Sequence, residues 1–79
     1  DMNRNKIEST ILSVLRDVLK CEVDLNTSRS NTHEWDSLKH IEVIFTLEDE
    51  LSLRFAEAEM TAIDSVDRIT LKALAHHAT

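Results

Sequence analysis

The stretch His33–Leu51, "HEWDSLKHIEVIFTLEDEL", decides the fold because a polar loop gives way within it to a helical pattern. Asp36 and Ser37 are residue types that cap helices, since a short side-chain oxygen can accept hydrogen bonds from first-turn amides. From Ser37 onward, apolar residues recur at helical spacing and predict a helix that ends at Leu51. Ser37 is therefore expected at the start of this helix, where a serine is often only a cap.

We expect this helix to bury one broad apolar face and to expose a mainly acidic one. The expected inner face is Leu38, Ile41, Ile44, Phe45 and Leu51. The expected outer face is Lys39, Glu42, Thr46, Asp49 and Glu50. Glu48 falls inside the apolar arc of an ideal helical wheel, which folding alone does not explain unless that edge meets solvent or a partner.

The same periodicity predicts helices on both sides of this stretch. Upstream, a first helix that Asn3 or Asn5 can cap has one apolar arc, formed by Ile7, Ile11, Val14, Leu15 and Val18. Downstream, "AEAEM" allows one or two turns, and Asp64 is expected to cap a last helix. The expected inner face of that helix is Val66, Ile69, Ala73 and Leu74.

The segment 22–35 is rich in Asn, Ser and Thr and predicts a long ordered loop, fastened to the helices by Val23, Leu25 and Trp35. The chain has no glycine or proline for tight hairpins, and no segment alternates long enough for a strand. The predicted fold is all-α: a four-helix bundle of three longer helices and one short helix, with the long loop between the first two. Residues 1–79 are expected to form a single domain.

The composition of the chain excludes some classes of function and favours others. The 79 residues include 9 basic and 15 acidic ones, a net charge of -6, which is the wrong sign for binding nucleic acid and favours partners with basic patches. So short a chain buries a modest core, and we expect a monomeric carrying or binding role without catalysis or membrane insertion. Cys21 is the only cysteine, so no internal disulfide can form, which suits the cytoplasm; it is expected to be a small apolar residue.

The residues at the second helix start resemble those of a known family. "DSL" at Asp36–Leu38 opens the helix, "IEVIFTLEDEL" follows, and the chain is small and acidic with a final "IDSVDRI" segment. With the helix order of long, long, short and long, this pattern is similar to that of acyl carrier proteins over essentially the whole length.

This resemblance implies a site and its partners. Ser37 would receive a 4'-phosphopantetheine arm from coenzyme A, installed by a separate transferase that uses magnesium, and the arm's thiol would carry acyl groups as thioesters. Asp36 would cap the helix and contact the transferase or its metal, and Leu38 would enter a partner pocket or the core. The implied contacts with basic enzymes of fatty-acid, polyketide or related lipid biosynthesis are Glu42, Glu48, Asp49 and Glu50.

The chain differs from the usual family pattern at two places, and both differences bear on which biosynthetic pathway it serves. Typical fatty-acid carriers have a glycine shortly before the aspartate, where this chain has His33, Glu34 and Trp35. They commonly have an acid two residues after the serine, where this chain has Lys39. Fatty-acid synthesis and a specialised pathway, such as polyketide or lipid-precursor assembly, therefore both remain open.

Other functions compete with that of a carrier. A helical interaction domain with the same fold but no arm, and a carrier of aminoacyl or peptidyl groups, both remain open. A serine hydrolase using His33 or His40 is disfavoured because the chain lacks the glycines of a nucleophile elbow; we expect His33 in the loop and His40 on the helix surface. His76 and His77 are adjacent and point about 100° apart, so they are not expected to share a metal ion.

Overall fold

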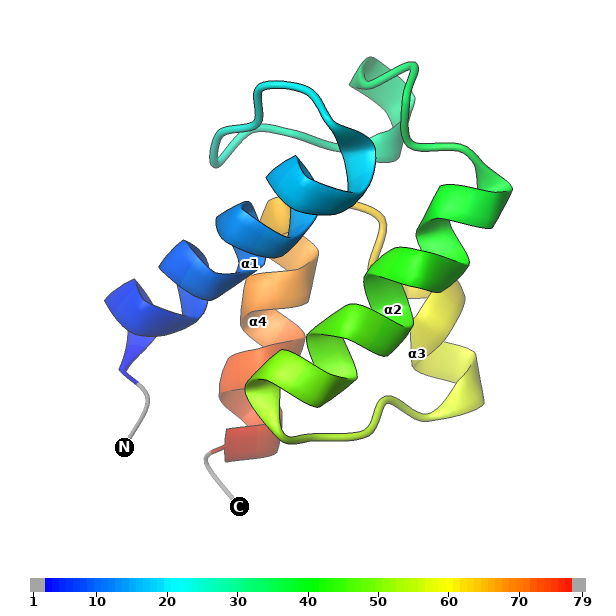
Figure 1. Ribbon diagram of the computed structural model, residues 1–79. Coiled ribbons are helices and arrows are strands. Elements are labelled where there is room, and N and C mark those ends of the chain that lie inside the picture. Colours follow the sequence, from blue (N-terminus) through cyan, green and yellow to red (C-terminus); the bar gives the residue numbers. More distant parts are fainter. Residues whose placement is uncertain (1–2, 78–79) are drawn as a thin grey trace.

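The computed structural model describes residues 3–77 as four α-helices and one short 3-10 helix around a shared core (Figure 1). This architecture confirms the predicted all-α fold with three longer helices and one short one. The elements are α1 (Arg4–Leu19), η1 (Arg29–Asn31), α2 (Ser37–Leu51), α3 (Glu57–Ala62) and α4 (Val66–His77). No helix within residues 3–77 is both long enough and apolar enough to cross a membrane.

Helix α1 begins at a side-chain cap and ends in a left-handed residue. Asn3 accepts a hydrogen bond from the amide of Lys6, at 2.9 Å, which confirms one of the two expected caps. Lys20 ends the helix at φ 56°, a conformation that glycine usually supplies and that this glycine-free chain gives to a lysine. The predicted apolar arc is buried except for Val18, which is half-buried beside the buried Leu19.

The core lies where α1 packs against both α2 and α4. Every long helix contributes aliphatic side chains, and Trp35 and Phe55 enter from the loops. Its fully buried members are Ile7, Ile11, Leu15, Val43, Leu47, Leu51, Ile63, Val66, Ile69 and Ala73.

The loop before α2 is ordered, as predicted, because it pairs with the segment before α4. Ser28 and Ser65 form an antiparallel bridge, in which the amide of Arg29 donates to the carbonyl of Asp64 at 2.9 Å. Trp35 is buried at 2% exposure, and Val23 is partly buried against the core. Leu25 was expected to fasten the loop, but it is 50% exposed, so that prediction was wrong.

Helix α2 has the predicted bounds but is turned about its axis. Its buried residues are His40, Val43, Ile44, Leu47 and Leu51. Leu38, Ile41 and Phe45 were expected in the core and are instead exposed. The buried face is thus rotated by about 100°, the angle of one residue, from the predicted face. His40, expected on the surface, is 7% exposed.

The start of α4 is capped by Ser65 and not by Asp64. The Ser65 hydroxyl accepts a hydrogen bond from the amide of Arg68 at 3.1 Å, whereas the Asp64 carboxylate pairs with the Arg68 guanidinium at 3.4 Å. The prediction of Asp64 as the cap was one residue early. Aspartate and serine both suit a cap. The bridge between Ser28 and Ser65 fixes the backbone at Ser65, the residue that takes the cap position.

Candidate functional site

Ser37 is the first residue of α2 and is exposed. It therefore belongs to the end of α2 that lies uppermost in Figure 1. Asp36 precedes it with an extended backbone and accepts a hydrogen bond from the amide of Lys39 at 2.9 Å. The carbonyl of Asp36 accepts from the amide of His40. Asp36 is therefore the N-cap of α2, as predicted, and it fixes the direction in which Ser37 leaves the loop.

The surroundings of Ser37 favour an anion. The capping bonds of Asp36 engage the amides of Lys39 and His40, while no residue within 3–77 accepts from the amides of Ser37 or Leu38. Free first-turn amides at the positive end of a helix dipole stabilise negative charge. Lys39 adds a cationic side chain on the first turn of the helix, although it also pairs with Glu42 at 3.6 Å.

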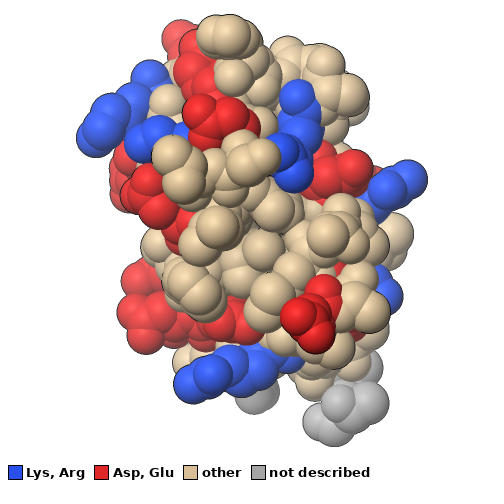
Figure 2. Space-filling model, turned by 90° about the vertical axis from the view of Figure 1, so that its right-hand side faces the viewer, with Lys and Arg blue, Asp and Glu red and all other residues tan. Residues whose placement is uncertain are grey.

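An apolar stripe, which we define as Leu38, Ile41 and Phe45, continues from Ser37 along the outer side of α2. Their exposed fractions are 76%, 52% and 62% respectively. Figure 2 shows this side of the molecule, where uncharged side chains form a continuous strip with acidic groups along its left edge. The rotation of α2 that contradicts the core prediction is what brings these side chains beside Ser37 at the surface.

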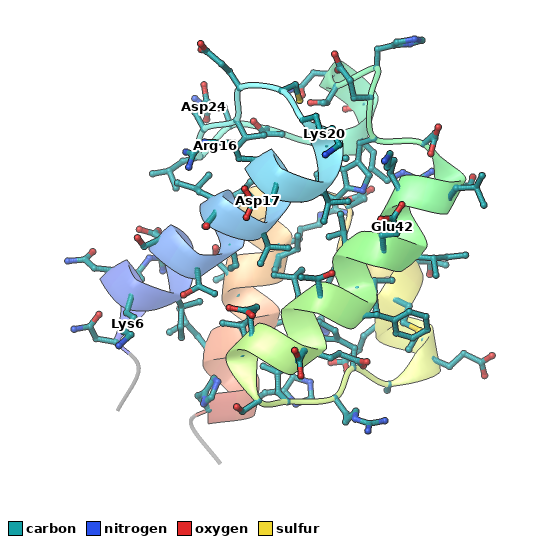
Figure 3. The ribbon with its side chains drawn as sticks, in the orientation of Figure 1. Lys6, Arg16, Asp17, Lys20, Asp24 and Glu42 are labelled. Atoms are coloured by element: carbon teal, nitrogen blue, oxygen red, sulfur yellow. The ribbon has the colours of Figure 1, made fainter. Side chains whose placement is uncertain are left out.

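Carboxylates border the apolar stripe. At 100° per residue, Glu42 and Asp49 lie along one edge of it and Glu48 along the other. Glu42 and Asp49 are exposed, and Glu42 projects from the side of α2 that faces the viewer in Figure 3. Apolar side chains with a charged border are typical of protein-binding surfaces.

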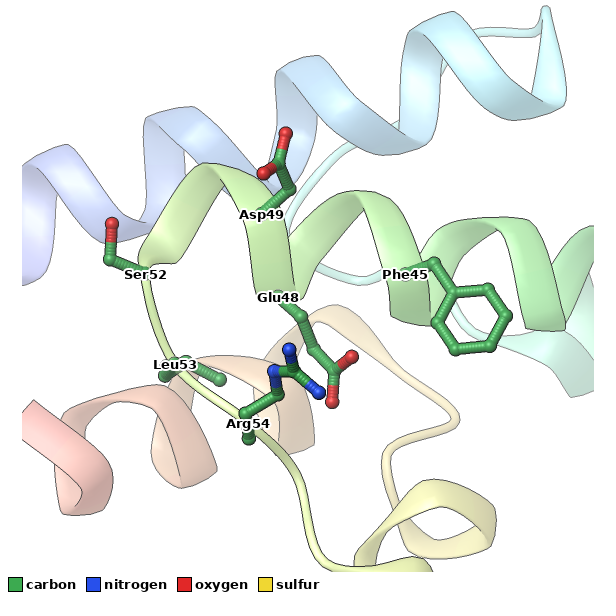
Figure 4. Close-up of a pocket in the computed structure, with 6 residues that line it drawn as sticks. All are labelled: Phe45, Glu48, Asp49, Ser52, Leu53 and Arg54. Carbon is green, nitrogen blue, oxygen red and sulfur yellow. The ribbon is translucent and has the colours of Figure 1, made fainter.

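Glu48 has a structural contact that explains its place in the apolar arc. Its carboxylate accepts a hydrogen bond from the amide of Phe55 at 2.9 Å, and its carbonyl accepts from Leu53. It thereby closes the turn after α2, in which Ser52 has φ 54°. Glu48 also lines an open hollow with Phe45, Asp49, Ser52, Leu53 and Arg54, and Figure 4 shows Arg54 and Glu48 pointing toward one another.

Glu50 is separated from the other predicted partner residues. It lies on the side of α2 that faces α1, where it lines a shallow hollow with Asp17 and the hydroxyl residues Ser9, Thr10, Ser13 and Thr46. The structure thus brings Glu42, Glu48 and Asp49 to the surface that carries the apolar stripe, but not Glu50. Within residues 3–77, no group of His, Cys, Asp and Glu side chains is arranged to hold a metal ion.

The histidines do not form a catalytic pair with Ser37. Both nitrogens of the buried His40 ring are engaged, Nδ1 by the indole of Trp35 at 3.0 Å and Nε2 by the carbonyl of Met60 at 2.7 Å. His33 is exposed in the loop, as expected. Both ring nitrogens of His40 are therefore occupied by other partners, and no residue within 3–77 is hydrogen-bonded to the Ser37 hydroxyl.

The helical wheel alone places the polar His40 side chain on the surface, so it does not reveal the buried contacts of His40. The available signal was Trp35 five residues earlier, since a buried indole N–H needs an acceptor.

Cys21 behaves as predicted: it packs partly buried against the core. Burial raises the pKa of its thiol, and the carboxylate of Glu34 raises it further, which disfavours the nucleophilic thiolate form.

Comparison with models of known protein families finds no match, and comparison with curated proteins finds none either. The function of this chain is therefore inferred from its residues and their geometry.

Proposed function

We propose that this protein is a carrier of the acyl carrier type, which bears acyl intermediates on a 4'-phosphopantetheine arm attached to Ser37. The observation that carries the proposal is the exposed Ser37 at the first position of α2, directly after the capping Asp36. The helix order and the acidic surface agree with it. Partner enzymes of fatty-acid, polyketide or related lipid biosynthesis would perform the chemistry on the cargo.

Attachment is a phosphoryl-type transfer in which this chain supplies the nucleophile. The Ser37 oxygen forms a bond to the phosphorus that bears the pantetheine in coenzyme A, and the pyrophosphate bond to that phosphorus breaks. Adenosine 3',5'-bisphosphate leaves, and the hydroxyl proton passes to a base of the transferase, whose magnesium ion offsets the phosphate charge. Once attached, the arm supplies a terminal thiol that holds an acyl group as a thioester.

The residues present fit a phosphodiester at this position. Ser37 needs no activating partner in its own chain, only exposure, and its side chain is exposed. The unpaired amides of Ser37 and Leu38 and the helix dipole favour the new negative charge. Lys39 lies on the first turn, where its ammonium group can approach the phosphate if it leaves Glu42. Asp36 keeps the helix start fixed while the serine is modified.

The apolar stripe and its acidic border are proposed to bind the partner enzymes. Leu38, at 76% exposure directly after Ser37, would enter an apolar pocket beside the transferase active site. Glu42 and Asp49 would meet basic residues around that pocket, because opposite charges steer association and fix orientation. A carrier must leave each enzyme quickly, and a small apolar contact with a charged border suits such transient binding.

The test of attachment is intact mass. Incubation of the chain with coenzyme A, magnesium and a broad-specificity phosphopantetheinyl transferase is expected to add one phosphopantetheine group, and fragmentation is expected to place it on Ser37. Ser37→Ala should fold and gain nothing. Ser9→Ala, which removes an exposed serine of α1, should gain the group as the natural chain does.

The starting mass must be read first, because a chain that already has the arm also gains nothing. If unmodified, folded protein resists several transferases, the carrier proposal fails and an interaction domain without the arm becomes the better description. If the chain does accept the arm, candidate partner enzymes can be tested for loading it. Loading with acyl groups indicates a lipid carrier, and loading with aminoacyl groups indicates an aminoacyl carrier.

Reversing charge at the stripe border is expected to slow modification. Glu42→Lys with Asp49→Lys should lower kcat/KM for arm transfer by about two- to thirtyfold, since two exposed ion pairs are lost and each contributes about 0.2–1 kcal/mol. The control is Glu22→Lys with Asp67→Lys, which changes the net charge equally at exposed positions away from the stripe.

The difference in kcat/KM between these two double variants should shrink as salt is added, because exposed charges are screened over about 10 Å at 0.1 M salt. Equal rates in both variants, with unchanged helicity by circular dichroism, would reject the acidic border as a partner contact.

A further inference from the structure

The open hollow at the end of α2 lies on the same side of that helix as Ser37. At about 100° per residue, Ser37, Ile41 and Phe45 fall within roughly 80° of one another around the helix axis. Phe45 also belongs to the lining of the hollow, which is completed by Glu48, Asp49, Ser52, Leu53 and Arg54 (Figure 4). The apolar stripe therefore leads from Ser37 along one face of α2 to this hollow.

The length of α2 agrees with the length of the proposed phosphopantetheine arm. At about 1.5 Å of rise per residue, Phe45 lies about 12 Å from Ser37 along the helix axis, and Glu48 lies about 16 Å from it. With about 14 bonds between the serine oxygen and the sulfur, an extended arm spans about 16 Å at the atom spacing of an extended peptide chain. An arm laid along the stripe thus places its sulfur at the level of Glu48, within the hollow.

The order of chemical groups in the arm matches the order of side chains along α2. A carbon with two methyl groups lies about 5 Å from the serine oxygen on the same scale. Ile41 lies at nearly the same level, about 6 Å along the helix axis. Two amides joined by methylene groups follow and run past Phe45, whose side chain is 62% exposed. Apolar atoms of the arm therefore meet apolar side chains, which removes both from water.

The polar part of the hollow suits a thioester. Ser52 and Arg54 follow α2 and are exposed. Both side chains have hydrogen-bond donors, and a thioester has a carbonyl oxygen that accepts. The Glu48 carboxylate already accepts a hydrogen bond from the amide of Phe55 at 2.9 Å. The turn that forms the hollow is therefore held in place by the protein alone.

We infer that the arm, when it is not inside an enzyme, rests along the apolar stripe with its acyl-bearing end in the hollow. This inference depends on the proposed attachment to Ser37. The stripe is also the surface proposed to bind partner enzymes, so an enzyme that contacts Ile41 and Phe45 displaces the arm from them. Binding of the carrier and release of its cargo into the enzyme are thereby coupled.

The resting contact is weak and reversible. The stripe offers separate side chains on a convex helix, and the hollow is open, so each group of the arm loses only part of its contact with water. The arm exchanges between a docked and a free state, and a partner enzyme needs only to shift that equilibrium.

A spin label at the end of the arm tests this position, with the nitroxide in place of an acyl group. Coenzyme A whose thiol already bears the nitroxide is transferred by a broad-specificity phosphopantetheinyl transferase, so Cys21, the only cysteine, stays unlabelled. Docking should broaden the amide NMR signals of 48–54 most strongly, whereas a free arm broadens those around Ser37 most. Reduction of the nitroxide should restore all signals.

Phe45→Ala should lower the ratio of docked to free arm by about three- to tenfold, the scale of burying part of a phenylalanine side chain. The broadening should then move back toward Ser37. Leu71→Ala is the matched control, because Leu71 is an apolar side chain of α4 that is 53% exposed, and it should leave the pattern unchanged. Both side chains are exposed, so both variants should fold.

The attachment and the resting place of the arm fail in different ways. An unmodified, folded chain that gains no mass from the labelled coenzyme A overturns both. A chain that gains the label but has its strongest broadening around Ser37, or at 57–63, overturns the resting place and leaves the attachment intact. Broadening of 48–54 in an isotope-labelled chain without the arm, caused by a spin-labelled second copy, also overturns the resting place, because it puts the arm on a neighbouring molecule.

Discussion

Replacing Trp35 with alanine is expected to lower the free energy of unfolding by about 3–5 kcal/mol, the usual cost of removing a large buried aromatic side chain. The indole is 2% exposed and joins the core cluster, so its loss leaves a cavity. It also leaves Nδ1 of His40 without its donor. Urea denaturation followed by circular dichroism measures the effect without needing the tryptophan.

Leu25→Ala is the control within the same loop. That side chain is 50% exposed, so its removal should change stability by less than about 0.5 kcal/mol. Trp35→Phe separates the two contributions of the indole, because it keeps most of the volume and removes the N–H; it should cost about 1–3 kcal/mol. A loss below about 0.5 kcal/mol in Trp35→Ala would mean that the indole is exposed in solution.

Leu47→Ala is expected to lower the free energy of unfolding by about 2–5 kcal/mol, since Leu47 is fully buried and its removal creates a cavity in the core. Leu38→Ala makes the same chemical change in the same helix at a side chain that is 76% exposed, and it should change stability by less than about 0.5 kcal/mol. The pair tests which face of α2 is buried.

The reverse order of these two effects would support the face expected from the sequence, with Leu38 inside. Leu38→Ala has a second expected effect if the partner surface is correct, which is slower arm transfer despite unchanged stability. Circular dichroism of both variants separates a lost contact with the transferase from a lost fold.

The bounds of α2 could be predicted from local chemistry, whereas its rotation could not. A cap such as Asp36 and the apolar spacing up to Leu51 act within a few residues of one another, so they can be read along the chain. Apolar residues cover more than half of the circumference of α2, and Val43 and Leu47 suit a core as well as Ile41 and Phe45 do. Which half turns inward depends on the packing against α1, which no single segment determines.

In the candidate site, too, some features could be predicted from the local sequence and others could not. Ser37 and Asp36 were predictable because a helix start is a local feature, and the exposure of Ser37 follows from it. The positions of the proposed partner contacts were less predictable: Glu50 lies toward α1, and Glu48 has a bond to Phe55 that closes a turn. Both outcomes depend on how α2 meets neighbouring segments. The left-handed Ser52 is also unforeseen, because no glycine marks it.

A helix with apolar side chains on two sides has two competing packings of similar hydrophobic gain, and burial alone does not discriminate between them. Polar bonds at the two ends of α2 do discriminate between the two packings. His40 reaches the carbonyl of Met60 near the start, and Glu48 reaches the amide of Phe55 near the end. A turn of α2 by one residue position breaks both bonds at once and leaves their partners unsatisfied. These two side chains therefore give the chain a single native packing in place of a mixture, and in doing so they keep Leu38, Ile41 and Phe45 at the surface.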